Sequence, residues 1–156
     1  MAYQKLQAGQ ALAVIPSDTI PVPNPSATAG SGTAAAPTGA QLVGTATTFT
    51  SSVAVGDIIY DSTNSVAATV LAVVSDTVLT TSAAIATGAS YIIYSQANNP
   101  STGCVLYVGV TGDVKVKTTS GNDVVFTGVP AGSFMPVNVT KVYATGTDAT
   151  NIVALW

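Results

Sequence analysis

Residues 105–129 read VLYVGVTGDVKVKTTSGNDVVFTGV, and this stretch decides the fold class of the chain. Valine or threonine recurs at alternate positions, and glycine with aspartate or asparagine separates the periodic runs. Because β-branched residues lose rotamer freedom in helices but pack well on a pleated surface, this pattern predicts strands joined by tight turns. The strands expected here span residues 105–110, 114–118 and 124–127.

The same alternation continues on both sides of this stretch. Two more strands are expected at 137–144 and 151–156, and another pair within 3–15, where Gly9-Gln10 supplies the turn. Because short turns join neighbouring strands, the economical fold is an antiparallel β-sandwich of jelly-roll type. No apolar stripe at helical spacing is long enough to predict a helix, so the chain is expected to be all-β.

Two segments rich in proline, glycine and small residues divide the chain into parts. The sequence PNPSATAGSGTAAAPTGA at 23–40 is typical of a linker, and QANNPSTG at 96–103 marks a second boundary. Short alternating runs between them predict a small β domain, barrel-like, at 40–96. The predicted parts of the chain are therefore 1–29, a linker at 30–39, this small domain, and 97–156.

The chain carries no histidine, glutamate or arginine, and its charges are four lysines and seven aspartates. Histidine is the side chain that titrates nearest neutrality, and glutamate and arginine are common acid/base and anion-binding groups. Their absence argues against an enzyme and excludes a Ser-His-Asp triad. We predict no catalytic residue, no cofactor and no metal ligand.

The remaining reactive side chains fit structural roles better than chemical ones. Cys104 lacks a histidine base and is expected to be a small buried residue. The loop Asp61-Ser62-Thr63-Asn64 offers oxygen atoms to calcium, but too few ligands converge there. An aromatic platform for sugars is a further alternative, although aromatic residues in alternating strands usually pack partly buried. Aspartates that fall at predicted turns are expected to bond the local backbone, and these are Asp57, Asp61, Asp76, Asp113, Asp123 and Asp148.

The low charge of the chain also limits its partners. Only 7% of the residues are charged, whereas a typical soluble domain has about 25%, and the net charge is −3. Neither nucleic acid nor a membrane is an expected partner, because no basic cluster and no long apolar segment is present. A neutral surface rich in hydroxyl groups favours packing against further copies of itself. Lys115 and Lys117 should lie on the outer face of a strand whose Val114 and Val116 face the core.

The C-terminal block resembles a family of tailed-bacteriophage virion structural proteins that includes head spike base proteins, also found in gene transfer agents. The residues that carry this resemblance are YVGVTGDVKV (107–116), VVFTGVPAGSFMPVNVTKVYATGT (124–147), DATNIVALW (148–156) and ALAVIPSDT (11–19). The pattern GVPAG, followed by a strand and a terminal IVALW, is the most distinctive part. Together these segments cover roughly half of the chain. The resemblance implies that 1–29 and 97–156 form one discontinuous sandwich, into which the small domain at 40–96 is inserted after the linker at 30–39.

The resemblance implies a capsid decoration (cement) protein or the base of a head spike or fibre. The partners it implies are further copies of the chain, as a homotrimer or homopentamer, the major capsid protein and a head fibre protein. The sandwich would dock and oligomerise, and the insert would project outward. The implied location is the capsid surface of the virion, after synthesis in the host bacterial cytoplasm. A tail, neck or baseplate component and a carbohydrate-binding adhesin module remain alternatives.

Overall fold

The structure is a computed structural model that describes residues 8–96 and 99–156. Its elements are strands and one short helix, and the strands form two antiparallel six-stranded sheets. The predicted all-β class is confirmed. The chain divides into two compact units, one formed by residues 1–18 and 102–156 and the other by residues 19–101.

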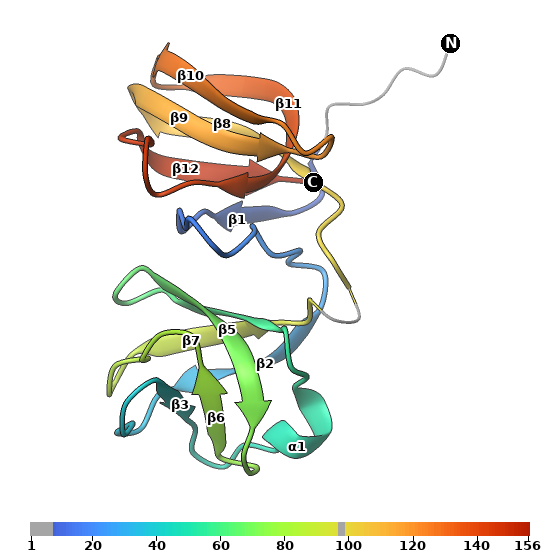
Figure 1. Cartoon of the computed structure of the whole chain (residues 1–156), viewed down its shortest axis with the longest axis vertical. Coiled ribbons are helices and arrows are strands. Elements are labelled where there is room, and N and C mark those ends of the chain that lie inside the picture. Colours follow the sequence, from blue (N-terminus) through green and yellow to red (C-terminus); the bar gives the residue numbers. More distant parts are fainter. Residues whose placement is uncertain (1–7, 97–98) are drawn as a thin grey trace. The chain divides into compact units, whose positions relative to one another are not determined.

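The discontinuous unit holds the first sheet, with strand order β1-β12-β8-β11-β9-β10 (Figure 1). Its terminal strands lie side by side, because β1 pairs with β12. This pairing fixes the C-terminus in the sheet, as the apolar C-terminal sequence predicts. The strand bounds are β1 Ala11–Ala13, β8 Cys104–Val110, β9 Gly112–Thr118, β10 Asp123–Val129, β11 Ser133–Val142 and β12 Thr150–Leu155.

Strand β11 bends this sheet into two layers. Its first part pairs with β8, where Phe134 lies opposite Tyr107, and its second part pairs with β9, where Val142 lies opposite Val116. The register shifts between these parts, at a segment that contains Pro136. Proline cannot donate to a ladder and is tolerated at such irregularities, and strands that switch layers in this way form the corners of sandwiches.

The core of this unit consists of alternate residues of its inner strands. Leu106 and Val108 on β8 and Val114 and Val116 on β9 are fully buried. The intervening residues of both strands remain partly exposed. The period-two pattern in the sequence therefore identifies the buried face correctly.

The inserted unit holds the second sheet, with order β2-β7-β4-β5-β6-β3 (Figure 1). Its buried core includes Leu42, Phe49, Ile59, Val70, Leu79, Ile85 and Ile93, each at most 1% exposed. Successive pairing of β4 with β5 and of β5 with β6 curls the sheet around these side chains. The bounds are β2 Thr28–Thr33, β3 Gln41–Val43, β4 Ile58–Asp61, β5 Val66–Val73, β6 Val78–Thr81, β7 Ser90–Tyr94 and α1 Phe49–Ser52.

The predicted linker at 30–39 is wrong in its first half. Residues 30–33 belong to β2, which pairs with β7, and Ala35 forms a bridge with Val43. Glycine and alanine suggest a flexible segment, but cross-strand hydrogen bonds to β7 hold this one in the sheet. The boundaries of the discontinuous unit move accordingly, from 29 to 18 and from 97 to 102.

Two local predictions also need correction. No helix was predicted, but residues 49–52 form α1, in which the hydroxyls of Ser51 and Ser52 donate to the Thr48 carbonyl. The last long strand begins at Ser133 rather than at 137, because its first part pairs with β8. The strand expected from residue 3 falls partly on residues 1–7, outside the described part of the chain.

Candidate functional site

The outer side of β9, β10 and the second part of β11 carries a cluster that we call the lysine face. It consists of Lys115, Lys117, Asp123, Lys141 and Tyr143. These are all the lysines within the described residues, and they come together because Lys117 lies opposite both Asp123 and Lys141 in the sheet. The predicted outward position of Lys115 and Lys117 is confirmed, since Val114 and Val116 are fully buried.

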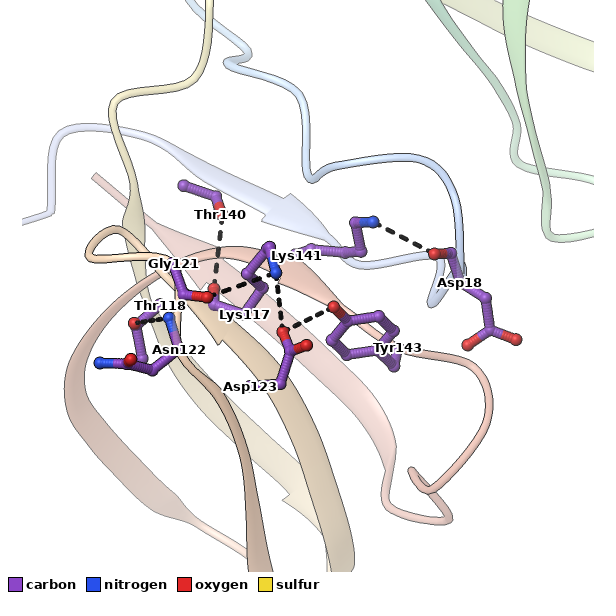
Figure 2. Close-up of polar contacts among 9 residues, drawn as sticks. All are labelled: Asp18, Lys117, Thr118, Gly121, Asn122, Asp123, Thr140, Lys141 and Tyr143. Carbon is purple, nitrogen blue, oxygen red and sulfur yellow. Dashed lines mark hydrogen bonds and ion pairs between the residues drawn. The ribbon is translucent and has the colours of Figure 1, made fainter.

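Tyr143 is the centre of the lysine face. The ammonium groups of Lys115 and Lys141 lie 4.9 and 5.1 Å from its ring centroid, within the range of cation–π attraction. Its hydroxyl donates to the Asp123 carboxylate at 2.7 Å, and Lys117 forms an ion pair with the same oxygen at 2.9 Å. Figure 2 shows both contacts converging on Asp123.

These contacts shift the ionisation of three groups. The pKa of Asp123 is lowered, first by the hydrogen bond from Tyr143 and then by that from Lys117. The same bond raises the pKa of the Tyr143 phenol, and the Asp123 carboxylate raises the pKa of Lys117. Each of these pKa shifts favours the charge state present at neutral pH, so the Asp123–Lys117 ion pair persists over a wider pH range.

Asp18 connects the N-terminal segment to this face. Lys141 Nζ donates to the Asp18 carbonyl at 3.1 Å, and the Asp18 carboxylate accepts from the backbone and the hydroxyl of Thr145 at 2.9 and 2.7 Å. Figure 2 shows Asp18 beside Lys141. The Thr145 backbone hydrogen bond is the main reason that the pKa of Asp18 is lowered. The Asp18 carboxylate is held mainly by Thr145, and the charge of Lys115 makes a smaller contribution to lowering its pKa.

The other layer of the same sheet has a different outer surface, which we call the apolar face. Its members are Val105, Tyr107, Phe134, Val153 and Leu155, which come from β8, β11 and β12 and bear no charge. Tyr107 lies opposite both Phe134 and Val153, and the rings of Tyr107 and Phe134 are 5.3 Å apart. Phe134 is 66% exposed, an unusual position for so large an apolar side chain.

Five of the predicted turn aspartates accept hydrogen bonds from backbone N–H groups. Asp57 accepts from Ala54 and Gln96, Asp61 accepts from Thr63 and Asn64, and Asp76 accepts from Thr50. The contacts of Asp57 with Ala54 and of Asp61 with Thr63 and Asn64 are local, as predicted. Asp76 instead bonds to the backbone of a distant segment, so the prediction of a local contact is wrong there. The oxygens of Asp61 that calcium would require are occupied by backbone and side-chain N–H groups.

Asp113 and Asp148 lie together beside a shallow, open hollow of ≈ 160 Å³ that Gly146 and Thr147 also line. Asp148 accepts from the Asp113 backbone N–H, and Asp113 accepts from Gly128. These two carboxylates therefore join segments distant in sequence, and the prediction that they bond the local backbone is wrong. Asp123 accepts from two side chains instead, those of Lys117 and Tyr143.

The cysteine and the tyrosines occupy separate places. Cys104 is buried as predicted, and burial raises the pKa of its thiol to about 12, which leaves it protonated and unreactive. Tyr60, Tyr91 and Tyr94 are buried in the inserted unit, whereas Tyr107 and Tyr143 lie on different faces of the discontinuous unit. These tyrosines do not form one aromatic platform, which removes the observation on which a sugar-binding surface would depend.

No group of three or more histidine, cysteine, aspartate or glutamate side chains gathers as a metal site in residues 8–96 and 99–156. In the same residues no helix has the length and hydropathy to cross a membrane. No protein-family model, curated protein or solved structure matches the chain.

Sequence reasoning missed the apolar face and the role of Tyr143. Phe134 follows the Pro130-Ala131-Gly132 turn, where no strand was expected, so its pairing with Tyr107 could not be anticipated. The Lys117–Asp123 contact had a detectable signal. These two residues flank a short turn between consecutive strands, a position where opposite charges face each other across a hairpin.

Proposed function

We propose that this chain is a virion structural protein of a tailed bacteriophage, a capsid decoration protein or the base of a head spike, which binds the major capsid protein as a homo-oligomer. The observation that carries the proposal is the apolar face. It gathers large uncharged side chains from three strands on the outer side of one sheet. The sequence resemblance indicates a phage particle, and the apolar face is the surface that we propose binds this particle.

The apolar face has the properties of a protein contact. Exposed and contiguous apolar residues on a soluble domain commonly mark interaction sites, and aromatic side chains supply much of the binding free energy there. Phe134 and Tyr107 lie side by side in this face. A flat sheet surface without charge suits a contact that depends on buried area and shape, as a cement protein requires.

The lysine face complements this contact through charge. It combines three ammonium groups with the carboxylate of Asp123, while the inserted unit carries aspartates and no lysine. A positive surface on an otherwise acidic chain favours an acidic region of the partner and orients the approach. We propose that the lysine face orients docking and the apolar face supplies most of the affinity.

The test is the binding of purified chain to particles that lack it. We expect wild-type chain to saturate such particles, and Phe134→Ser to weaken binding at least tenfold, because an aromatic anchor contributes on the order of 2 kcal/mol. Val74→Ser is the matched control, since Val74 is 61% exposed on the inserted unit and outside the apolar face. Equal loss from both variants, or no loss from Phe134→Ser, would refute the assignment of the docking surface.

The number of copies per particle, measured by quantitative mass spectrometry of virions, tests the position separately. Copies in the hundreds support a decoration protein across the capsid lattice, and about sixty support a spike base at the fivefold vertices. A dozen or fewer copies would overturn the head assignment in favour of a neck, tail or baseplate component. Absence of the chain from virions would overturn the proposed function as a whole.

A further inference from the structure

Strand β10 forms an open edge of the first sheet. Among the described residues it pairs with β9 alone and ends the strand order of its sheet. Natural proteins protect such edges with lysine, proline, a bulge or a covering segment. The sequence of β10, DVVFTGV, contains neither lysine nor proline, and its only irregularity is the register shift after Phe126. The first four residues are therefore a regular and unprotected template for another strand.

The direction of the backbone groups of β10 follows from its neighbours. Thr118 N–H donates to the Asn122 carbonyl, and hydrogen-bonded pairs alternate along an antiparallel ladder. By this alternation Val124 and Phe126 direct their backbone groups toward β9. A second contact agrees with this direction. The Lys115 carbonyl accepts from the Tyr143 N–H, so the backbone groups of Lys115 point toward β11. Val125 lies opposite Lys115, and its backbone groups are therefore not used in pairing with β9. The N–H and carbonyl of Val125 thus point to the open edge.

The inner side of β10 is apolar yet uncovered. Val124 lies opposite Val116, and Phe126 lies opposite Val114, so these side chains continue the core face of β9. Val114 and Val116 are fully buried, whereas Val124 is 37% exposed and Phe126 is partly exposed. The core of the unit therefore ends before it covers its last strand. An added strand would extend this core over both side chains.

The other sheet edges are poorer templates. Strands β1 and β3 have three residues each, and β3 is flanked by the bridge from Ala35. Strand β2 is longer, but its sequence TAGSGT offers no large side chain to bury. Edge pairing that also buries apolar area is therefore best supported at β10.

We propose that β10 pairs antiparallel with β10 of a second copy of this chain, about a twofold axis at Val125. In this register Val125 meets Val125 of the second copy through their outward backbone groups. Val124 lies opposite Phe126 of the second copy, and Asp123 lies opposite Thr127. Apolar side chains thus meet apolar ones, and the two Asp123 carboxylates stay apart. Such self-complementarity is what an isologous contact requires, and it favours a second copy over an unrelated strand.

The proposed contact does not depend on the virion role and is tested on the purified chain. Val125→Pro removes an N–H that points to the open edge, so it blocks strand addition while β10 keeps its bonds to β9. Ser31→Pro is the matched control. Ala34 N–H donates to the Ala89 carbonyl, and the same alternation directs Ser31 N–H to the open edge of β2.

Sedimentation equilibrium reports the outcome. We expect wild type and Ser31→Pro at twice the 15.5 kDa chain mass, or a multiple of it, and Val125→Pro at half the wild-type value. Thermal melting verifies that each variant is folded. A monomeric wild type, or a trimer or pentamer that Val125→Pro leaves unchanged, would overturn the proposal.

A disulfide tests the register without disrupting the strand. Residues directly opposite in a hydrogen-bonded antiparallel pair have Cα atoms about 5.5 Å apart, within the range that a disulfide spans. Val125→Cys should therefore form a covalent dimer under mild oxidation. Thr127→Cys, which faces Asp123 of the second copy rather than itself, should remain largely uncrosslinked. Wild type controls for Cys104, which is buried. Absence of a Val125→Cys dimer, or equal crosslinking at both positions, would refute the register.

Discussion

Gly109 on β8 packs directly against Asn151 on β12, whose backbone adopts a left-handed conformation with φ of 53°. A Cβ atom at Gly109 would lie 2.7 Å from both the Cβ and the carbonyl oxygen of Asn151. Asparagine is among the few residues with a side chain that tolerate this backbone region. The two residues therefore allow β12 to distort locally while it remains paired with β8.

Replacement of Gly109 by alanine should destabilise the protein by about 1–3 kcal/mol, because the added methyl group meets backbone that cannot move freely. Urea unfolding of wild type and Gly109→Ala measures the difference. Gly9→Ala is the control, since no atom lies within 4 Å of a Cβ built there. Equal stability of Gly109→Ala and wild type would show that β12 can shift to make room.

Charge reversal at Lys115 and Lys117 should leave the fold intact. Both side chains lie on the outer face, and exposed ion pairs contribute at most about 1 kcal/mol. The matched double variant Val114→Asp/Val116→Asp should not fold, because it places unpaired carboxylates in a fully buried layer. Circular dichroism and thermal melting distinguish the two cases. An unfolded Lys115→Glu/Lys117→Glu protein would contradict the assigned faces.

The Asp123 contacts predict a dependence of stability on pH. The pKa of Asp123 is lowered in the folded state, so its stabilisation is present above the unfolded value of about 3.9 and is lost as the pH falls through the folded value. The pKa of Lys117 is raised, so its contribution is present below about pH 10.4 and is lost as the pH rises through its folded value.

NMR titration of the Asp123 carboxyl measures its pKa in the folded protein directly. Its midpoint should lie below the ordinary value in wild type and rise toward that value in Tyr143→Phe, which removes the main hydrogen bond. Asp123→Asn has no carboxyl group at this position, so the fall in its free energy of unfolding on acidification should be smaller than in wild type. A wild-type midpoint at or above the ordinary value would contradict the Tyr143 contact.

Asp57 should be essential for the turn that precedes β4. It is 1% exposed, and its two oxygens accept from the backbone N–H groups of Ala54 and Gln96, both at 2.9 Å. Asp57→Ala leaves these donors without their acceptor, at a cost of about 1–3 kcal/mol for each buried group. Chemical unfolding should show a larger loss than for Asp76→Ala, whose hydrogen bonds are exposed. Equal losses would indicate that water replaces the buried carboxylate.

The strand pattern could be predicted because alternation is a local property. Between residues 104 and 129 the strands follow the alternating valines, and the glycine-containing turns separate them. The contacts of Asp61 with Thr63 and Asn64 could be predicted because they join neighbouring residues. Those of Asp76, Asp113 and Asp148 could not, because they join segments distant in sequence. Helix α1 was missed because four residues carry too weak a periodic signal against the flanking valines.

The sequence by itself determined the all-β class, the buried side of the strand that holds Val114 and Val116, and the shortage of charge, because these depend on residue type and local spacing. Only the tertiary structure decided which strands become neighbours. That pairing brings Lys141 and Tyr143 beside Lys115, places Phe134 opposite Tyr107 and leaves β10 at an open edge. Pairing between strands distant in sequence depends on how whole faces pack together. Alternation within one strand carries no information about its partner.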